Sequence, residues 1–410
     1  MIETVSEASG ERGIRSDRSV IIYLSFLGIL LATGIDIALP AFDAIEDGLE
    51  SSSNVSLIVT LYVIGMALGQ LIVGPVADRF GRRPAILGGL GLYAVGAIAS
   101  ALAPSFGLLL VARLIWGLGA AAPAGLRSAI TRDLYSGDKM ARITTIMMAV
   151  FLLGPIFVPL LGDFLIRVAP WPVIFWFAAG LAVVGALWCV RFGETLAEEN
   201  QRPLELRQIW TGVKVVVRTR VTVGHMLANV FLTGAFFIYL GSAQPVFDQV
   251  FDRSSQFAVF FALSGVVTVP PLILNNRLIK KYGARRMSML ACAGSASIAV
   301  GAVIPTLVLE GRPSFWLWYV WVLFVTGLLT LATPSITALA LEPMGALAGT
   351  ASSLLFFSGF AFGAVLAAIF DRLVNDTVTP FVVGFALYTT IGLAFMWWAG
   401  GTAALFSESE

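Results

Sequence analysis

Long apolar stretches run through almost the whole chain, and they limit its possible folds more than any other feature. A helix needs about 20 apolar residues to cross the roughly 30 Å hydrocarbon core of a bilayer. Charged residues make up only 12% of the sequence, against about 25% in soluble domains. The chain is therefore predicted to be an all-α membrane protein of twelve transmembrane helices. The predicted spans are 19–41, 54–77, 84–103, 105–127, 140–166, 171–191, 221–246, 255–276, 287–309, 313–340, 344–370 and 379–403.

The basic residues predict the orientation of these helices, because Lys and Arg accumulate in cytoplasmic loops. With the N-terminus in the cytoplasm, 21 of the 26 basic residues fall in cytoplasmic segments, four fall in outer loops, and Arg113 lies inside a helix. An even number of helices then places both termini in the cytoplasm. We expect a multi-pass protein whose surface is embedded in the lipid bilayer.

The longest polar interval divides the chain into two halves. A weak repeat supports the division: Gly81-Arg82-Arg83 follows the second span, and Gly283-Ala284-Arg285-Arg286 follows the eighth. Transporters built from related halves bind their substrates near the midplane between them. The predicted units are a cytoplasmic N-terminal segment (1–18), an N-terminal six-helix bundle (19–192), a cytoplasmic linker (193–220), a C-terminal six-helix bundle (221–403) and a cytoplasmic tail (404–410).

Residues 74–84, after the second span, read Gly-Pro-Val-Ala-Asp-Arg-Phe-Gly-Arg-Arg-Pro. Gly74 lets neighbouring helices approach, Asp78 can cap the next helix and pair with an Arg, and Gly81 allows a tight turn. A simpler interpretation is that the arginines only anchor a cytoplasmic loop. The pattern resembles the signature of the major facilitator superfamily, which implies two six-helix bundles and a loop that latches them in the outward-open state. The latch residues implied are Gly74, Asp78, Arg79, Gly81, Arg82, Arg83 and, after the fourth span, Asp133.

Further motifs narrow this resemblance. Residues 113–119 in the fourth span resemble the second motif of the superfamily, an embedded Arg before a Gly-rich stretch. Residues 154–162 resemble the motif of drug/proton antiporters, with Pro159 and a single Gly162 in place of paired glycines. This variant is similar to the bicyclomycin and chloramphenicol resistance group. That group also shows Asp-x-x-x-Pro, Arg-Asp-Leu-Tyr and Glu-Thr-Leu motifs, present here at 36–40, 132–135 and 194–196. The antiporter motif residues are Gly154, Pro155, Pro159 and Gly162.

Two ionisable side chains, Asp36 and Arg113, fall deep within predicted helices, where insertion costs at least about 2.5–3.5 kcal/mol. The resemblance implies that their helices line a central cavity. The hypothesis is that Asp36 alternately binds a proton and a substrate, and that Arg113 tunes its proton affinity. The alternatives are a static buried ion pair, or an Asp36 that ends its helix in headgroup water. Some related exporters carry a second acid where this chain has Gly28, so a low proton stoichiometry and neutral or singly charged substrates are expected.

Polar and aromatic side chains in three other spans are weaker candidates for a substrate cavity. Amides in such positions more often bond neighbouring helices. Lipid-facing or interhelical packing accounts equally well for about half of the aromatic residues. The candidates are Tyr62, Gln70, Asn229, Phe236, Phe237, Tyr239, Phe356, Phe357 and Phe360.

Several function classes are disfavoured. The net charge of +1 and the lack of a basic run argue against a nucleic-acid partner. Cys189 and Cys292 have no metal-ligand spacing, and no constellation of catalytic groups points to an enzyme. Neither a cofactor nor a metal is expected; the energy source is a proton gradient. The sequence predicts a monomeric, proton-coupled exporter in the bacterial inner membrane. Its substrates would be small lipophilic drugs, amphenicol-like or otherwise neutral or monocationic; the alternative is an exporter of a sugar, nucleoside or other metabolite.

Overall fold

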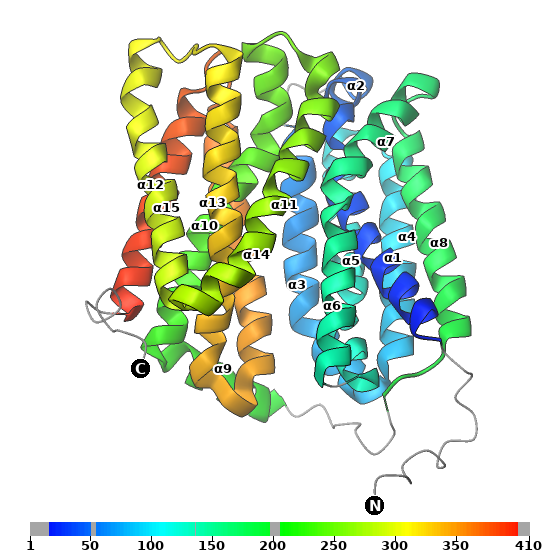
Figure 1. Cartoon of the computed structure of the whole chain (residues 1–410). Helices are drawn as coiled ribbons and strands as arrows, with labels where there is room; N and C mark the ends of the chain where they lie inside the picture. Colours follow the sequence, from blue (N-terminus) through cyan, green and yellow to red (C-terminus); the bar gives the residue numbers. More distant parts are fainter. Residues whose placement is uncertain (1–15, 51–54, 136, 197–205, 401–410) are drawn as a thin grey trace, which may run out of the picture.

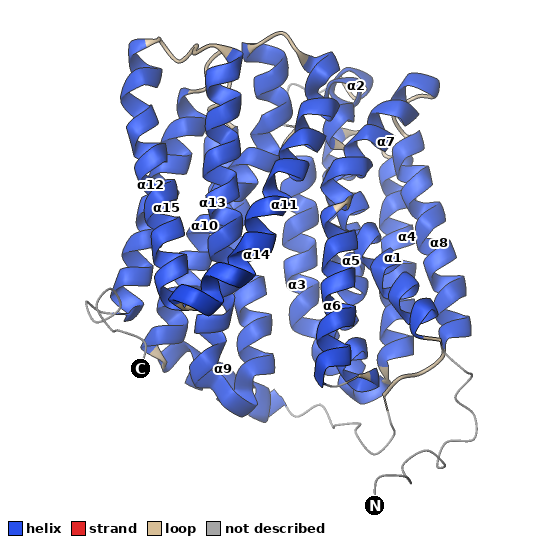
Figure 2. Cartoon of the chain, viewed as in Figure 1, coloured by secondary structure: helices blue, strands red, loops and turns tan. Residues whose placement is uncertain are grey.

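A computed structural model describes residues 16–50, 55–135, 137–196 and 206–400. These residues form helices joined by turns and contain no strand (Figure 2). Of the predicted cytoplasmic segments, residues 1–15, the part of the linker from 197 to 205, and the tail 404–410 lie outside the described residues. The long helices run roughly side by side, and the short helix α9 lies at one end of the bundle (Figure 1).

The helices follow the predicted apolar stretches closely. Their bounds are α1 Asp17–Asp36, α2 Phe42–Gly48, α3 Leu57–Phe80, α4 Arg82–Ala101, α5 Phe106–Leu134, α6 Gly137–Leu152, α7 Gly154–Val168, α8 Val173–Phe192, α9 Leu206–Arg218, α10 Arg220–Pro245, α11 Phe257–Tyr282, α12 Ala284–Val308, α13 Phe315–Leu341, α14 Ala348–Asp371 and α15 Thr379–Gly400.

Ten helical segments in the described part of the chain are long and apolar enough to cross a membrane. They match ten of the predicted stretches. The other two are the stretch 140–166, which forms α6 and α7, and the stretch 255–276, which forms α11. A multi-pass membrane protein follows from these lengths, because no water-soluble packing requires so many long apolar helices.

The prediction of a single helix over 140–166 is corrected by the structure. This stretch forms two helices, α6 and α7, which meet at Leu153. Pro155, two residues later, has no N–H to donate to the preceding turn, which weakens a continuous helix at this point. The break is tight: the Leu153 amide donates to the Val150 carbonyl at 3.1 Å, and the Phe157 amide then donates to the Leu153 carbonyl at 2.9 Å. The first residues of the antiporter motif therefore begin a new helix.

Helices α1–α8 lie together, and α10–α15 lie beside them (Figure 1). Within the first group, glycines allow α3, α4 and α5 to pack backbone to backbone. A Cβ on Gly65 or Gly117 would meet backbone of the facing helix, at the Leu114 carbonyl and the Tyr62 carbonyl respectively. Small residues at such crossings let helix axes approach closely inside a membrane. This packing holds α5, the helix that carries Arg113, in a fixed position.

Candidate functional site

Asp36 is the last residue of α1, yet the chain keeps it inside the bundle. Helical turns continue beyond it through α2, and the residue is only 3% exposed. It lies near enough to interact electrostatically with Tyr62 of α3 and with Tyr239 of α10. These two tyrosines belong to different groups of helices. The carboxyl group therefore lies where the two groups meet, and the structure disagrees with an Asp36 exposed to headgroup water.

Arg113 is fully buried, at 0% exposure, in α5. Its Nε donates to the Ile58 carbonyl at 3.0 Å, and its Nη2 donates to the Gly34 carbonyl at 2.7 Å. The guanidinium also lies over the Tyr62 ring at 4.8 Å and the Trp116 ring at 4.6 Å. Such contacts compensate for much of the cost of burying the cation.

No ion pair or hydrogen bond joins Asp36 to Arg113 among the described residues. The alternative of a static buried ion pair is therefore absent from this conformation. Arg113 reaches the backbone two residues before Asp36, at Gly34, and so influences the position of the end of α1 rather than neutralising its carboxylate.

The antiporter motif of α7 packs against the helix that carries Asp36. A Cβ on Gly154 would meet the Ala32 side chain, and a Cβ on Gly162 would meet the Ile37 carbonyl at 2.6 Å. These two glycines, two turns apart, allow α7 to approach α1 on both sides of Asp36. Larger side chains at either position would push the end of α1 away.

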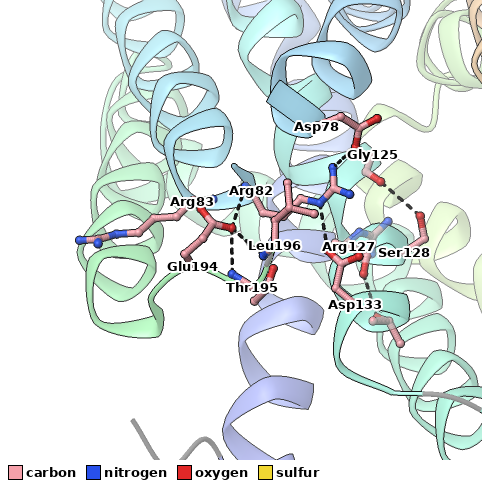
Figure 3. Close-up of polar contacts among 11 residues, drawn as sticks. Asp78, Arg82, Arg83, Gly125, Arg127, Ser128, Asp133, Glu194, Thr195 and Leu196 are labelled. Carbon is pink, nitrogen blue, oxygen red and sulfur yellow. Dashed lines mark hydrogen bonds and ion pairs between the residues drawn. The ribbon is translucent and has the colours of Figure 1, made fainter. Parts of the chain in front are cut away.

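The charged loop after α3 forms a compact network (Figure 3). Arg82 is buried and bridges two acids: its Nη1 lies 2.6 Å from Asp78 Oδ1, and its Nε lies 3.0 Å from Asp133 Oδ2. Asp133 belongs to the last turn of α5. One guanidinium thus ties together the ends of α3, α4 and α5 through charge-assisted bonds.

Glu194, which follows α8, completes this network. Its carboxylate accepts hydrogen bonds from the backbone amides of Arg82 at 2.9 Å and Arg83 at 3.0 Å, and from those of Thr195 and Leu196. These first two amides begin α4, where a negative charge is favourable. Gly81 has a φ of 99°, and a Cβ on it would contact the Glu194 carboxylate.

Two roles predicted for the loop motif differ from the structure. Asp78, in the last turn of α3, pairs with the Arg82 side chain as predicted, but it does not cap the next helix. Glu194 caps α4 instead. Gly74 has open space around it, since a Cβ there would meet nothing within 4 Å. No close helix approach requires this glycine in the present conformation. Arg79 lies over the Phe80 ring at 5.3 Å.

The aromatic candidates for the cavity fall into two sets: some are buried and pack against other aromatic rings, and the others lie at the exposed surface. Phe237 packs edge-on against Phe360 at 5.5 Å, and Phe360 also packs against a cluster that contains Leu31 and Met66 of the other group of helices. Tyr239 stacks on Phe261 at 5.3 Å. In contrast, Phe236 and Phe356 are 38% and 44% exposed. Phe357 contacts the exposed Phe362. The structure therefore brings Phe237 and Phe360 to the meeting of the two halves.

The polar candidates pack against neighbouring helices, and one of them, Gln70, also bonds a neighbouring helix. Tyr62 is fully buried between α1 and α5, so it faces no cavity in this conformation. Gln70 donates from Nε2 to the Ala121 carbonyl at 3.2 Å. The Asn229 amide packs against Gly359 of α14. Packing between helices therefore accounts for the presence of these three side chains within the apolar spans.

Polar contacts also join helices at the end of the bundle opposite α9, and one of their members, Asp371, is a residue that sequence reasoning missed. Gln244 of α10 donates to Asp43 of α2 at 2.7 Å and joins the two halves. Asp371, the last residue of α14, is buried and accepts a hydrogen bond from Ser242 of α10; it also bonds Ser56, just before α3. Asp371 escaped notice because it closes an apolar stretch and has no motif around it.

The fold and these buried polar groups define a multi-pass membrane transporter. The family model described as Major Facilitator Superfamily matches residues 24–368. The chain is 30% identical over 374 residues to a bicyclomycin resistance protein homolog of Haemophilus influenzae, covering 90% of this chain and 93% of that one. It is 27% identical over 379 residues to a chloramphenicol resistance protein of Pseudomonas aeruginosa, covering 89% and 87%.

The fold is also similar to the inward-open xylose transporter of Escherichia coli, with a TM-score of 0.75, 14% identity, and coverage of 96% of this chain and 97% of that one. The chain belongs to the Major Facilitator Superfamily, and its relatives include proteins named for resistance to bicyclomycin and chloramphenicol.

Proposed function

We propose that the protein exports small lipophilic molecules, amphenicol-like or otherwise neutral or monocationic, in exchange for protons. It would cross the bacterial inner membrane twelve times as a monomer, with both termini and α9 on the cytoplasmic side. The names of its relatives support antibiotics as one substrate class. The alternative, export of a sugar, nucleoside or other metabolite, uses the same fold and is separated by the experiment below.

The observation that carries the proposal is the position of Asp36. A carboxyl group inside a membrane bundle marks a proton or substrate pathway, because burial without function is costly. Asp36 lies near side chains of both halves, and no arginine of the described chain forms an ion pair with it. An unpaired acid between two moving halves can exchange its proton for a substrate when the halves rearrange.

The hydrogen bonds between the halves support alternating access. Among the described residues, the side-chain bonds that cross from one half to the other involve Asp43 with Gln244 and Asp371 with Ser56. Both lie opposite α9, which is the outer end under the proposed orientation. The structure would then correspond to a state closed on the outside. The network of Arg82 with Asp78 and Asp133 would engage the other half in the outward-open state.

The decisive experiment compares wild type with Asp36→Asn in proteoliposomes that carry an internal pH indicator, with chloramphenicol as substrate. We expect chloramphenicol to release protons through wild type and not through Asp36→Asn, while the variant still binds the drug. Asp376→Asn, which alters an exposed acid, serves as the matched control.

An Asp36→Asn protein that moves protons as wild type does would place coupling elsewhere. If wild type does not respond to chloramphenicol but responds to a panel of sugars and nucleosides, the metabolite alternative replaces drug export.

A further inference from the structure

A second arginine on α5, Arg127, is the last residue of the predicted span 105–127 and lies within the bundle. It is only partly exposed. Its guanidinium lies against Gly28 of α1, such that a Cβ on Gly28 would meet Arg127 Nη1. Gly28 is eleven residues after the start of α1 at Asp17, or roughly 16 Å along the helix. The charge is therefore well inside the protein.

The guanidinium of Arg127 has almost no partner. Its Nε reaches the Ala124 carbonyl at 3.5 Å, the outer limit of a hydrogen bond, and the group lies 5.4 Å from the Phe151 ring of α6. The ion pairs of the described chain use other basic residues. Neither terminal nitrogen donates to a group of the described chain, so both keep hydrogen-bond donors for a ligand, and the partial exposure of the side chain makes them accessible.

Arg113 on the same helix shows what a structural arginine looks like in this protein. It is fully buried, donates from Nε and Nη2 to two backbone carbonyls and contacts two aromatic rings, and only its Nη1 has no hydrogen-bond partner. Arg127 lies 14 residues later, roughly 21 Å along α5. Its one hydrogen bond to a carbonyl, from Nε to Ala124, is long at 3.5 Å. The difference indicates that Arg127 is held ready for an acceptor that the protein itself does not provide.

The surroundings of Arg127 are apolar on the side that faces the second half. Phe151, which lies under the guanidinium, also packs against a small cluster formed by Leu31, Met66 and Ala121. Phe360 of α14 packs against the same cluster. A ligand here would meet a planar cation at one end and aliphatic and aromatic side chains from both halves at the other.

From this geometry we propose that Arg127 binds the carboxylate of lipophilic aromatic acids, as a substrate subsite about 12 Å from Asp36 along α1. The guanidinium fork matches a carboxylate through two parallel hydrogen bonds, Gly28 leaves the space in which the fork lies, and the Phe151 cluster accepts the apolar body. The inference rests on the proposed exporter function and extends its substrates to monoanions.

The test measures equilibrium binding of two probes to the purified full-length protein at pH 7.5: nalidixate, an aromatic carboxylate, and chloramphenicol, which is neutral. Arg127→Gln is expected to raise the Kd for nalidixate by roughly tenfold to a hundredfold, and the Kd for chloramphenicol by less than about threefold. Arg127→Lys keeps the charge but not the fork, so an intermediate loss for nalidixate is expected. Arg142→Gln removes an exposed charge from α6 and serves as the control.

Gly28→Ala provides an independent variant that keeps the arginine. Its Cβ displaces the guanidinium, so it should weaken nalidixate binding selectively by a few-fold. Equal losses of both probes in Arg127→Gln, or an unchanged Kd for nalidixate, would overturn the subsite. Wild type that binds chloramphenicol but not nalidixate overturns the subsite and leaves drug export standing, whereas wild type that binds neither probe counts against both proposals.

Discussion

The guanidinium of Arg113 donates to the backbone carbonyl of Gly34 at 2.7 Å, and this bond ties α5 to the end of α1 just before Asp36. A second bond from the same group reaches the Ile58 carbonyl at 3.0 Å. One side chain therefore sets the spacing of three helices around the proposed coupling site.

Arg113→Lys tests this arrangement, because an ammonium group keeps the charge but has no fork to reach two carbonyls. We expect a loss of about 2–3 kcal/mol of stability and a lower rate of drug-driven proton release. Thermal unfolding in detergent and the proteoliposome assay measure the two effects. A lysine variant with wild-type stability would show that the charge alone matters.

The bond between Gln244 and Asp43 predicts how the halves separate. Gln244→Glu places two carboxylates in contact, and a repulsion of about 1 kcal/mol shifts the ratio of the two states about fivefold toward the outward-open one. Distances between spin labels on the two halves, measured in nanodiscs, report the shift. Gln244→Met removes the bond without adding charge and should produce a smaller shift; equal shifts would contradict the repulsion.

Gly117 should tolerate no side chain, because a Cβ there would meet the Tyr62 carbonyl. Gly117→Ala is expected to lower stability by about 1–3 kcal/mol, since backbone must move to make room. Gly91→Ala on α4 is the matched control: a Cβ there would meet nothing within 4 Å, so its stability should change by less than about 1 kcal/mol. Comparable melting temperatures for the two variants would argue against tight packing of α3 on α5.

Glu194 should stabilise the charged network after α3 through the start of α4. Glu194→Ala removes the acceptor of the Arg82 and Arg83 amides, so we expect a loss of about 1–2 kcal/mol. Glu194→Gln keeps one good acceptor oxygen and should lose less. Thermal unfolding distinguishes the two; an alanine variant as stable as wild type would mean that water replaces the carboxylate.

Much of this protein could be predicted from its sequence, because hydropathy and charge act locally along the chain. The apolar stretches predicted the helices to within a few residues, apart from the break at Leu153, and the loop motif predicted that Arg82 and its acids belong together. The family followed from the same residues. Each of these inferences depends on residue types and spacing, which a sequence displays directly.

Only the tertiary structure decided which polar groups meet. It showed that Arg113 binds backbone carbonyls rather than Asp36, that Glu194 rather than Asp78 caps α4, and that Arg127 lies against Gly28. It also buried Asp371 against Ser242. The physical reason is that a membrane helix is apolar on nearly every side, so its sequence has no polar face to mark inside from outside; the rotation and crossing of each helix settle where a side chain points.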